Sequence, residues 1–86
     1  MPIEFIEHAL IRAKERNITE KEIIAAVKTG NKLPGKFGRI RLRFEKIFAI
    51  NKEIKGIVYS KKLVIVIAEL RNGTLTVISV ISKFIK

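Results

Sequence analysis

The sequence predicts an α+β fold in which an N-terminal αα-hairpin packs on an antiparallel sheet of three to four strands. Apolar residues follow a helical period over residues 1–30 and a two-residue strand period from Phe37 onward. Helices that precede strands, without alternating with them, are typical of α+β proteins. The chain of 86 residues suffices for one domain, with the helical hairpin at 1–30 and the sheet at 37–82.

The first helix is expected over residues 3–16, where apolar residues recur at helical spacing. Its predicted buried stripe comprises Ile3, Ile6, Ala9, Leu10 and Ala13. Asn17 follows this stripe and is a residue that tolerates the left-handed conformation that often closes a helix.

The second helix has the clearest start signal in the chain. Thr19 and Glu22 have the spacing of a capping box, and Ile18 and Ile23 that of a hydrophobic staple. The helix is expected to end near Gly30. Two short helices joined this tightly predict an αα-hairpin.

The strand part begins after an expected loop at 31–36, where Pro34-Gly35 is a turn signal. Residues 37–44 alternate between apolar side chains and arginines, as in a strand with one buried face. Residues 45–56 fit three interpretations, a continued strand, a bulge or a helical turn, and are followed by a short strand at 57–59.

Residues 63–70 are apolar on both faces, which predicts a central and covered strand. Asn72-Gly73 predicts a two-residue type I′ hairpin. The last strand is expected to run from Thr74 to about Ile81, and residues 82–86 to form a frayed tail or a short final turn.

The net charge of +10 is unevenly distributed along the chain. Residues 1–31 hold five basic and five acidic residues, whereas residues 32–86 hold thirteen Lys and Arg against three Glu. A one-sided field of this kind attracts polyanions, so a nucleic acid is the expected partner. Solubilisation of a basic protein is the alternative explanation.

The composition also limits the chemistry and the location. The sequence has no cysteine, which excludes disulfides and thiolate metal sites and fits a reducing cytoplasm. The most apolar run, residues 63–70, is far shorter than the roughly 20 residues of a membrane helix. We therefore expect a cytoplasmic protein, without membrane association, metal or cofactor. The Lys, Glu and Ile bias resembles that of heat-adapted proteins.

The first candidate site is a ridge on the first helix formed by His8, Arg12 and Arg16, which recur every four residues. His8 is the only histidine, and beside a guanidinium it is suited to acid/base work at a phosphate. The competing explanation is that this ridge forms helix-surface ion pairs with Glu4 and Glu7.

The second candidate site is the row of strand arginines, Arg39, Arg41 and Arg43, which repel one another and suit bidentate phosphate binding. The predicted nucleic-acid surface extends this row by Lys46, Tyr59, Lys61 and Lys62. Tyr59 has the ring that stacks on a base. The alternative is that carboxylates from elsewhere neutralise the row.

The segment from Phe5 to Leu33 resembles the opening of domain-of-unknown-function family 4258. That family shows a pattern close to H-A-x-x-R-x-x-x-R-x-I-[ST]-x-x-[ED]-[VI], matched here by His8, Ala9, Arg12, Arg16, Ile18, Thr19, Glu22 and Ile23. Asn17 stands where a glycine is common. The last strand ends in TVISVIS, where the family often has a tyrosine.

The family is similar to the RelE/ParE toxin group, small basic α+β proteins that include ribosome-dependent endoribonucleases and are neutralised by an acidic antitoxin. The resemblance implies a toxin-type protein acting on RNA, with His8, Arg12 and Arg16 as catalytic residues. Two alternatives stay open, a non-catalytic nucleic-acid- or ribosome-binding module and a protein-interaction module for an acidic antitoxin-like partner. The oligomeric state is open.

Overall fold

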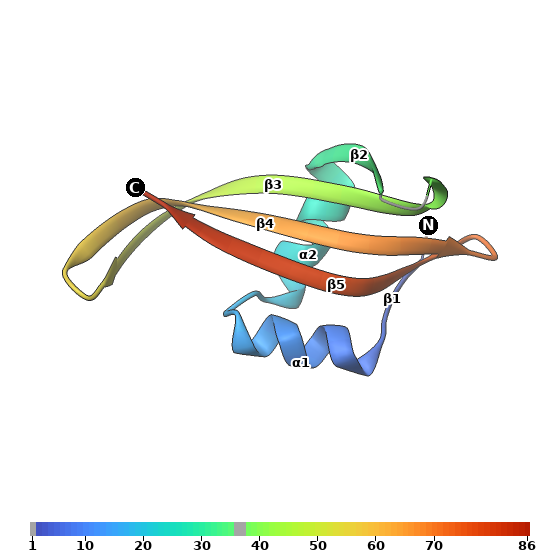
Figure 1. The fold of residues 1–86 in the computed structure, drawn as a ribbon, viewed down its shortest axis with the longest axis horizontal. Coiled ribbons are helices and arrows are strands. Elements are labelled where there is room, and N and C mark those ends of the chain that lie inside the picture. The colour runs from blue at the N-terminus through green and yellow to red at the C-terminus, as the bar shows by residue number, and fades with distance from the viewer. Residues whose placement is uncertain (1, 36–37) are drawn as a thin grey trace.

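The computed structural model describes residues 2–35 and 38–86, with the backbone alone at 34, 35 and 38–40. The elements are β1 (Ile3–Phe5), α1 (Glu7–Glu15), α2 (Glu20–Thr29), β2 (Asn31–Gly35), β3 (Gly38–Ile54), β4 (Ile57–Arg71) and β5 (Thr74–Ile85). The strands form one sheet in the order β1-β5-β4-β3-β2 (Figure 1). β1 runs parallel to β5, and the other neighbours are antiparallel.

The predicted α+β layout of two helices on a sheet is confirmed, but the expected strand count is wrong. The described chain has five strands in a mixed sheet, not three to four in an antiparallel one. The additional strands come from the expected first turn of helix and from the expected loop at 31–36, which contains β2. Lys36 lies outside the described residues.

β1 replaces the expected start of the first helix because the sheet offers its backbone partners. The Leu75 amide donates to the Pro2 carbonyl at 3.0 Å, and the Ile6 amide donates to the Val77 carbonyl at 3.2 Å. Ile3 and Phe5 pack against the core. Three alternating residues are too few to distinguish a strand from a helical turn by periodicity.

The junction between the helices follows the sequence signals. Asn17 has a φ of 56°, and Thr19 and Glu22 form the complete capping box. Ile18 and Ile23 are both buried. α2 ends at Gly30 with a φ of −80°, outside the left-handed region.

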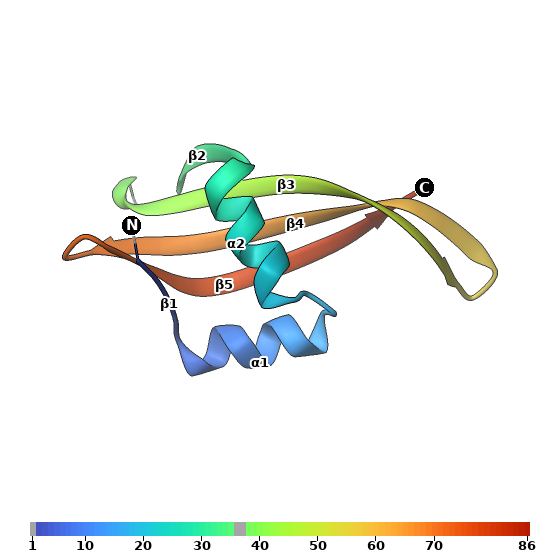
Figure 2. The same cartoon turned by 180° about the vertical axis from the view of Figure 1, so that it is seen from behind.

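The helices cover one face of the sheet and one of its edges. α2 crosses the far face in Figure 1 and the near face in Figure 2, whereas α1 lies along β5. The buried core comprises Ala9, Ala13, Ile18, Ile23, Ala26, Phe44, Val64, Val66, Ala68, Leu75, Val77 and Val80. β4 is the central strand, as predicted, but α2 covers only one of its faces.

The C-terminal strands are longer than expected. Of residues 45–56, those up to Ile54 continue β3 through an irregularity between Ala49 and Lys52, so the strand and bulge interpretations are both confirmed. Lys55 and Gly56 form the turn. The predicted turn at Asn72-Gly73 is confirmed, with φ of 48° and 77°. The expected tail at 82–86 is wrong, since β5 continues to Ile85 by pairing with β4.

Candidate nucleic-acid interface

The ridge on α1 contains one direct contact between its predicted catalytic residues. His8 is exposed, and the Arg12 Nε donates to His8 Nε2 at 3.4 Å. Arg12 also forms an ion pair with Glu15, at 3.1 Å between Nη1 and Oε2. His8 is therefore exposed to solvent, and the Arg12 guanidinium beside it is also bound by Glu15.

Arg16 is directed differently from the other two ridge residues. Its Nη1 donates to the Val80 carbonyl at 2.6 Å, and the Ser82 hydroxyl donates to the Arg16 carbonyl at 3.1 Å. These two bonds join the end of α1 to β5. The contacts of Arg16 thus serve the packing of the helix, and the exposed pair consists of His8 and Arg12.

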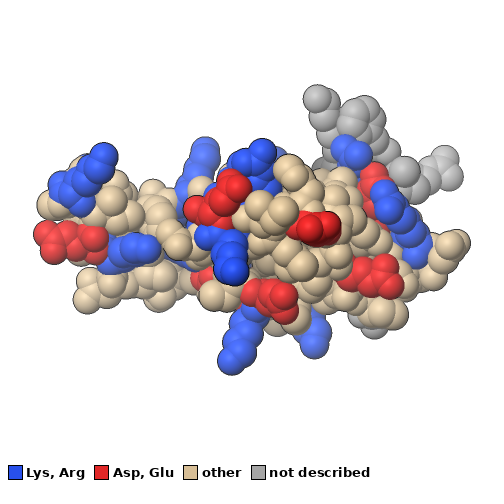
Figure 3. All heavy atoms as spheres, turned by 90° about the horizontal axis from the view of Figure 1, so that it is seen from below, with Lys and Arg blue, Asp and Glu red and all other residues tan. Residues whose placement is uncertain are grey.

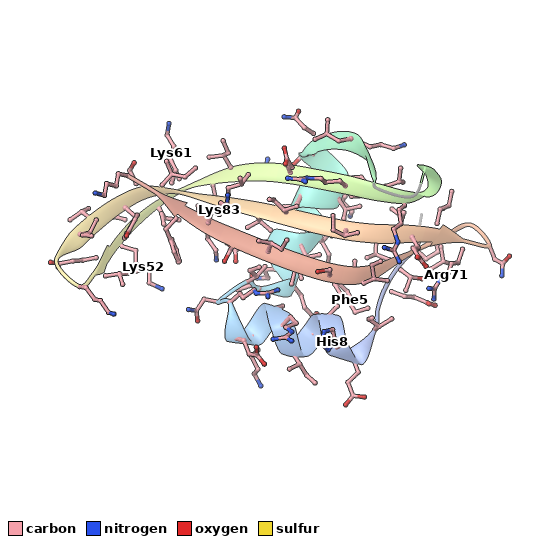
Figure 4. The ribbon with its side chains drawn as sticks, viewed as in Figure 1. Phe5, His8, Lys52, Lys61, Arg71 and Lys83 are labelled. Atoms are coloured by element: carbon pink, nitrogen blue, oxygen red, sulfur yellow. The ribbon has the colours of Figure 1, made fainter. Side chains whose placement is uncertain are left out.

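The flank of α1 on which this pair lies can be assigned from the helical spacing. Leu10 and Lys14 line a hollow together with Glu20 at the start of α2. Residues 8 and 12 lie on the opposite flank, away from α2. They therefore face the side on which the sheet is uncovered, where Figure 4 shows His8 in front of α1.

The strand arginines Arg41 and Arg43 are on this open face, but each has a carboxylate partner. Arg41 Nε lies 3.0 Å from Glu69 Oε2, and Arg43 Nη2 lies 2.6 Å from Glu45 Oε1. Arg71 contacts the other oxygen of Glu69. Two of the three glutamates in residues 32–86 thus pair with Arg41 and Arg43. For these two arginines the alternative expectation, that carboxylates from elsewhere neutralise the row, describes the contacts. The Arg39 side chain lies outside the described residues.

Glu69 is well held by these arginines. Its side chain is largely buried among open-face neighbours. Hydrogen bonds from Arg41 and then Arg71 lower its pKa below the ordinary value, and they outweigh the effect of burial. Arg41 and Glu69 are far apart in the sequence and meet because β3 pairs with β4. The spacing of residues in the sequence therefore did not predict this ion pair.

Lys62 lies on the opposite face of the sheet, beneath the helices. It is 6% exposed, and its Nζ contacts the Asn17 carbonyl and both oxygens of Glu22, at 3.0 and 3.2 Å. Burial raises the pKa of Glu22, but the hydrogen bonds from the Thr19 amide and from Lys62 together lower it by more, so the pKa lies below its ordinary value. Lys62 is therefore not part of an exposed basic surface.

The remaining predicted residues do not form one surface either. Lys46 pairs with Val64 and so lies on the helix-covered face of the sheet. Its Nζ lies 5.7 Å from the centre of the Phe48 ring. The Tyr59 ring packs on Phe84 with a centroid distance of 5.7 Å. Lys61 is exposed. Of the predicted strand residues with described side chains, the register leaves Arg41, Arg43 and Lys61 on the open face.

Sequence reasoning missed the apolar character of this open face. Its register brings Leu33, Ile47, Leu63, Ile65, Ile67 and Ile81 together. Ile47 is 57% exposed and Ile81 39%. Ile65 between them is only 5% exposed. Both helices lie behind or beside the sheet as it is seen in Figure 1, so neither covers this face. The apolar second face of β4 was the available signal, and it was interpreted as covered.

The positive charge is also placed differently from the prediction. Four of the lysines that form no ion pair with a described residue lie toward the end where the β3–β4 hairpin projects, namely Lys52, Lys55, Lys61 and Lys83. Others without such a pair lie in α1, α2, β2 and the first part of β3, namely Lys14, Lys21, Lys28, Lys32 and Lys46. Figure 4 shows Lys52, Lys61 and Lys83 toward this end and Arg71 toward the other. On the side that carries α1, basic and acidic side chains are interspersed (Figure 3).

The comparisons with known proteins add no relative. No family model, no curated protein and no solved structure matches the chain. None of the helices within the described residues has the length and apolar content needed to cross a membrane. Across 2–35 and 38–86, no group of three or more His, Asp or Glu side chains is arranged to hold a metal ion.

Proposed function

We propose that this protein acts on RNA as a toxin-type protein of the RelE/ParE-like kind, with His8 as the reacting side chain. The observation that supports this most is the exposed His8–Arg12 pair, on the flank of α1 that faces the open side of the sheet. A solvent-open imidazole next to a guanidinium has the composition needed to move a proton beside a phosphate.

The proposed reaction uses a neighbouring hydroxyl of the RNA as nucleophile. When the Arg12 guanidinium turns from His8 Nε2 to the bound phosphate, that nitrogen is free to take the proton of the 2′-OH, whose oxygen attacks the adjacent phosphorus. The bond to the 5′ oxygen breaks, that oxygen takes a proton from water, and the hydroxide left behind takes the proton held by His8. The products are a 2′,3′-cyclic phosphate and a 5′-OH end. Arg12 stabilises the charge on the phosphate oxygens, because its remaining N–H groups stay available beside His8.

Expression in a bacterial host tests this function. Wild-type protein is expected to arrest growth and fragment transcripts, and His8→Ala to do neither at equal protein level. Lys14→Ala is the matched control, because Lys14 is exposed on the opposite flank of the same helix. Undiminished growth and intact transcripts with the wild-type protein would contradict the proposal. RNA bound without cleavage would favour a non-catalytic binding module.

A second function, a protein-interaction module, is supported by the apolar open face. Monomeric proteins rarely leave a contiguous apolar patch uncovered unless something binds it. A second copy would bring +10 against +10, so an acidic partner fits better. Co-expression with an acidic reading frame that neighbours the gene tests this. The complex should be lost with Ile47→Lys, and a complex unaffected by this change would oppose the assignment to this face.

A further inference from the structure

The β3–β4 hairpin extends past the rest of the sheet. β5 ends at Ile85, which pairs with Lys61, and from there to the turn β4 pairs with β3 alone. The molecule measures 45 × 24 × 21 Å, and this two-stranded ribbon forms one end of its long axis (Figures 1 and 2). No described helix lies over it.

The ribbon has a defined conformation. Its turn at Lys55-Gly56 has φ of 51° and 81°, both left-handed, as in a type I′ hairpin. At its base the Tyr59 ring packs on Phe84, and the Lys52 Nζ lies 5.2 Å from the centre of that ring. The aromatic pair therefore holds the base of the ribbon and one of its cations in place.

Basic residues outnumber acidic ones at this end. Residues 46–61 contain Glu53 as their one acidic residue. Lys52, Lys55, Lys61 and Lys83 form no ion pair with a described residue. Arg41 and Arg43 on the same strand are instead bound by Glu69 and Glu45. Lys14, Lys21 and Lys28 on the helices form no ion pair with a described residue either. On their side of the molecule, however, basic and acidic side chains are interspersed (Figure 3), whereas the hairpin itself carries one glutamate among its lysines.

We propose that this lysine-bearing hairpin end binds the phosphate backbone of RNA without reading its bases, an inference that rests on the proposed action on RNA. Lysine is a hydrated point charge that suits phosphates and is depleted in protein–protein interfaces. The ribbon is narrow, and its cations lie on strands whose residues rise by about 3.3 Å each. Val58, 60% exposed, and Ile57, 38% exposed, offer no hydrogen-bonding group to a base edge.

Binding of a labelled RNA hairpin, measured by fluorescence anisotropy over a salt series, tests this proposal. The variant is Lys52→Gln/Lys55→Gln/Lys61→Gln, and the matched control is Lys14→Gln/Lys21→Gln/Lys28→Gln, which removes three exposed charges from the helices. Each phosphate contact contributes about 0.7–0.9 to the slope of log K against log salt. The variant is expected to lower that slope by about 2 and the affinity by at least tenfold, and the control to bind within about twofold of wild type.

The outcomes separate this inference from the proposed function. Equal losses in the variant and in the control would show a response to bulk charge and would overturn the inference alone. An acidic peptide that binds these lysines when RNA does not bind the wild-type protein would overturn both. Loss of binding in the variant alone supports the inference, whether or not the wild-type protein cleaves the RNA. Circular dichroism confirms that both variants are folded.

Discussion

Replacement of Lys62 by methionine separates the structural role of this residue from the RNA contact that its sequence position suggested. The substitution keeps an apolar side chain of similar length and removes the ammonium group. It leaves the Glu22 carboxylate without its cation and the Asn17 carbonyl without a donor. Lys62 is buried by α2 and the helix junction, so this loss falls on the contact between helices and sheet.

The expected cost follows from the burial of the pair. Truncation of one partner of a buried ion pair costs about 3–5 kcal/mol. The Glu22 side chain is 20% exposed, so solvent screens part of the loss, and we expect about 2–3 kcal/mol of unfolding free energy. For a domain of this size, 1 kcal/mol shifts Tm by about 4–8 °C, which predicts a fall of about 10–20 °C.

Thermal and urea unfolding followed by circular dichroism measure this effect. Lys61→Met is the matched control, since Lys61 is the exposed neighbour of Lys62, and its Tm should change by less than about 2 °C. The pKa of Glu22 is lowered from its ordinary 4.5 in the folded state. The stabilisation by this carboxylate is therefore present above pH 4.5 and lost as pH falls through the lowered pKa. The difference between Lys62→Met and wild type should shrink in that acidic range. A Lys62→Met protein as stable as Lys61→Met at pH 7 would refute the reasoning.

Three further predictions concern contacts elsewhere in the fold. Gly30→Ala should lower the unfolding free energy by about 1–3 kcal/mol in urea, because a Cβ there would lie 2.6 Å from the Glu45 carbonyl oxygen; unchanged stability would contradict that close approach. Arg16→Met should lower Tm by more than Arg12→Met does, since only Arg16 bonds to β5, and the reverse order in thermal unfolding would oppose this role. The Glu69 carboxyl should titrate by NMR below its ordinary pKa of 4.5, and its pKa should rise in Arg41→Gln. The stabilisation by this carboxylate is therefore present above pH 4.5 and lost as pH falls through the lowered pKa. A pKa of Glu69 that Arg41→Gln leaves unchanged would contradict the pairing.

The local elements were largely predictable from the sequence. The capping box, the left-handed Asn17 and the turn at Asn72-Gly73 depend on residues only a few positions away, and each was predicted correctly. β1 was not predictable, because three residues join the sheet only through their register with Leu75 and Val77. Short-range patterns thus specify turns and caps, whereas edge strands depend on partners far along the chain.

The candidate site was less predictable for the same physical reason. Lys61 and Lys62 are identical and adjacent in sequence, yet strand alternation exposes one and buries the other beside Glu22. Likewise, the neutralisation of Arg41 by Glu69 depends on the pairing of β3 with β4. The sequence identified the excess of charge in the strands, and the register determines which cations remain available.

Cleavage of a defined RNA by the purified protein tests the central claim most directly. The reaction is run in EDTA with wild-type protein, His8→Ala and Lys14→Ala, and the product ends are identified by mass spectrometry. The proposed role of His8 predicts 2′,3′-cyclic phosphate and 5′-OH ends with wild-type protein and Lys14→Ala, and a rate lower by about 10²–10⁴-fold with His8→Ala. RNA that stays intact with wild-type protein, or that His8→Ala cleaves at the wild-type rate, would contradict it.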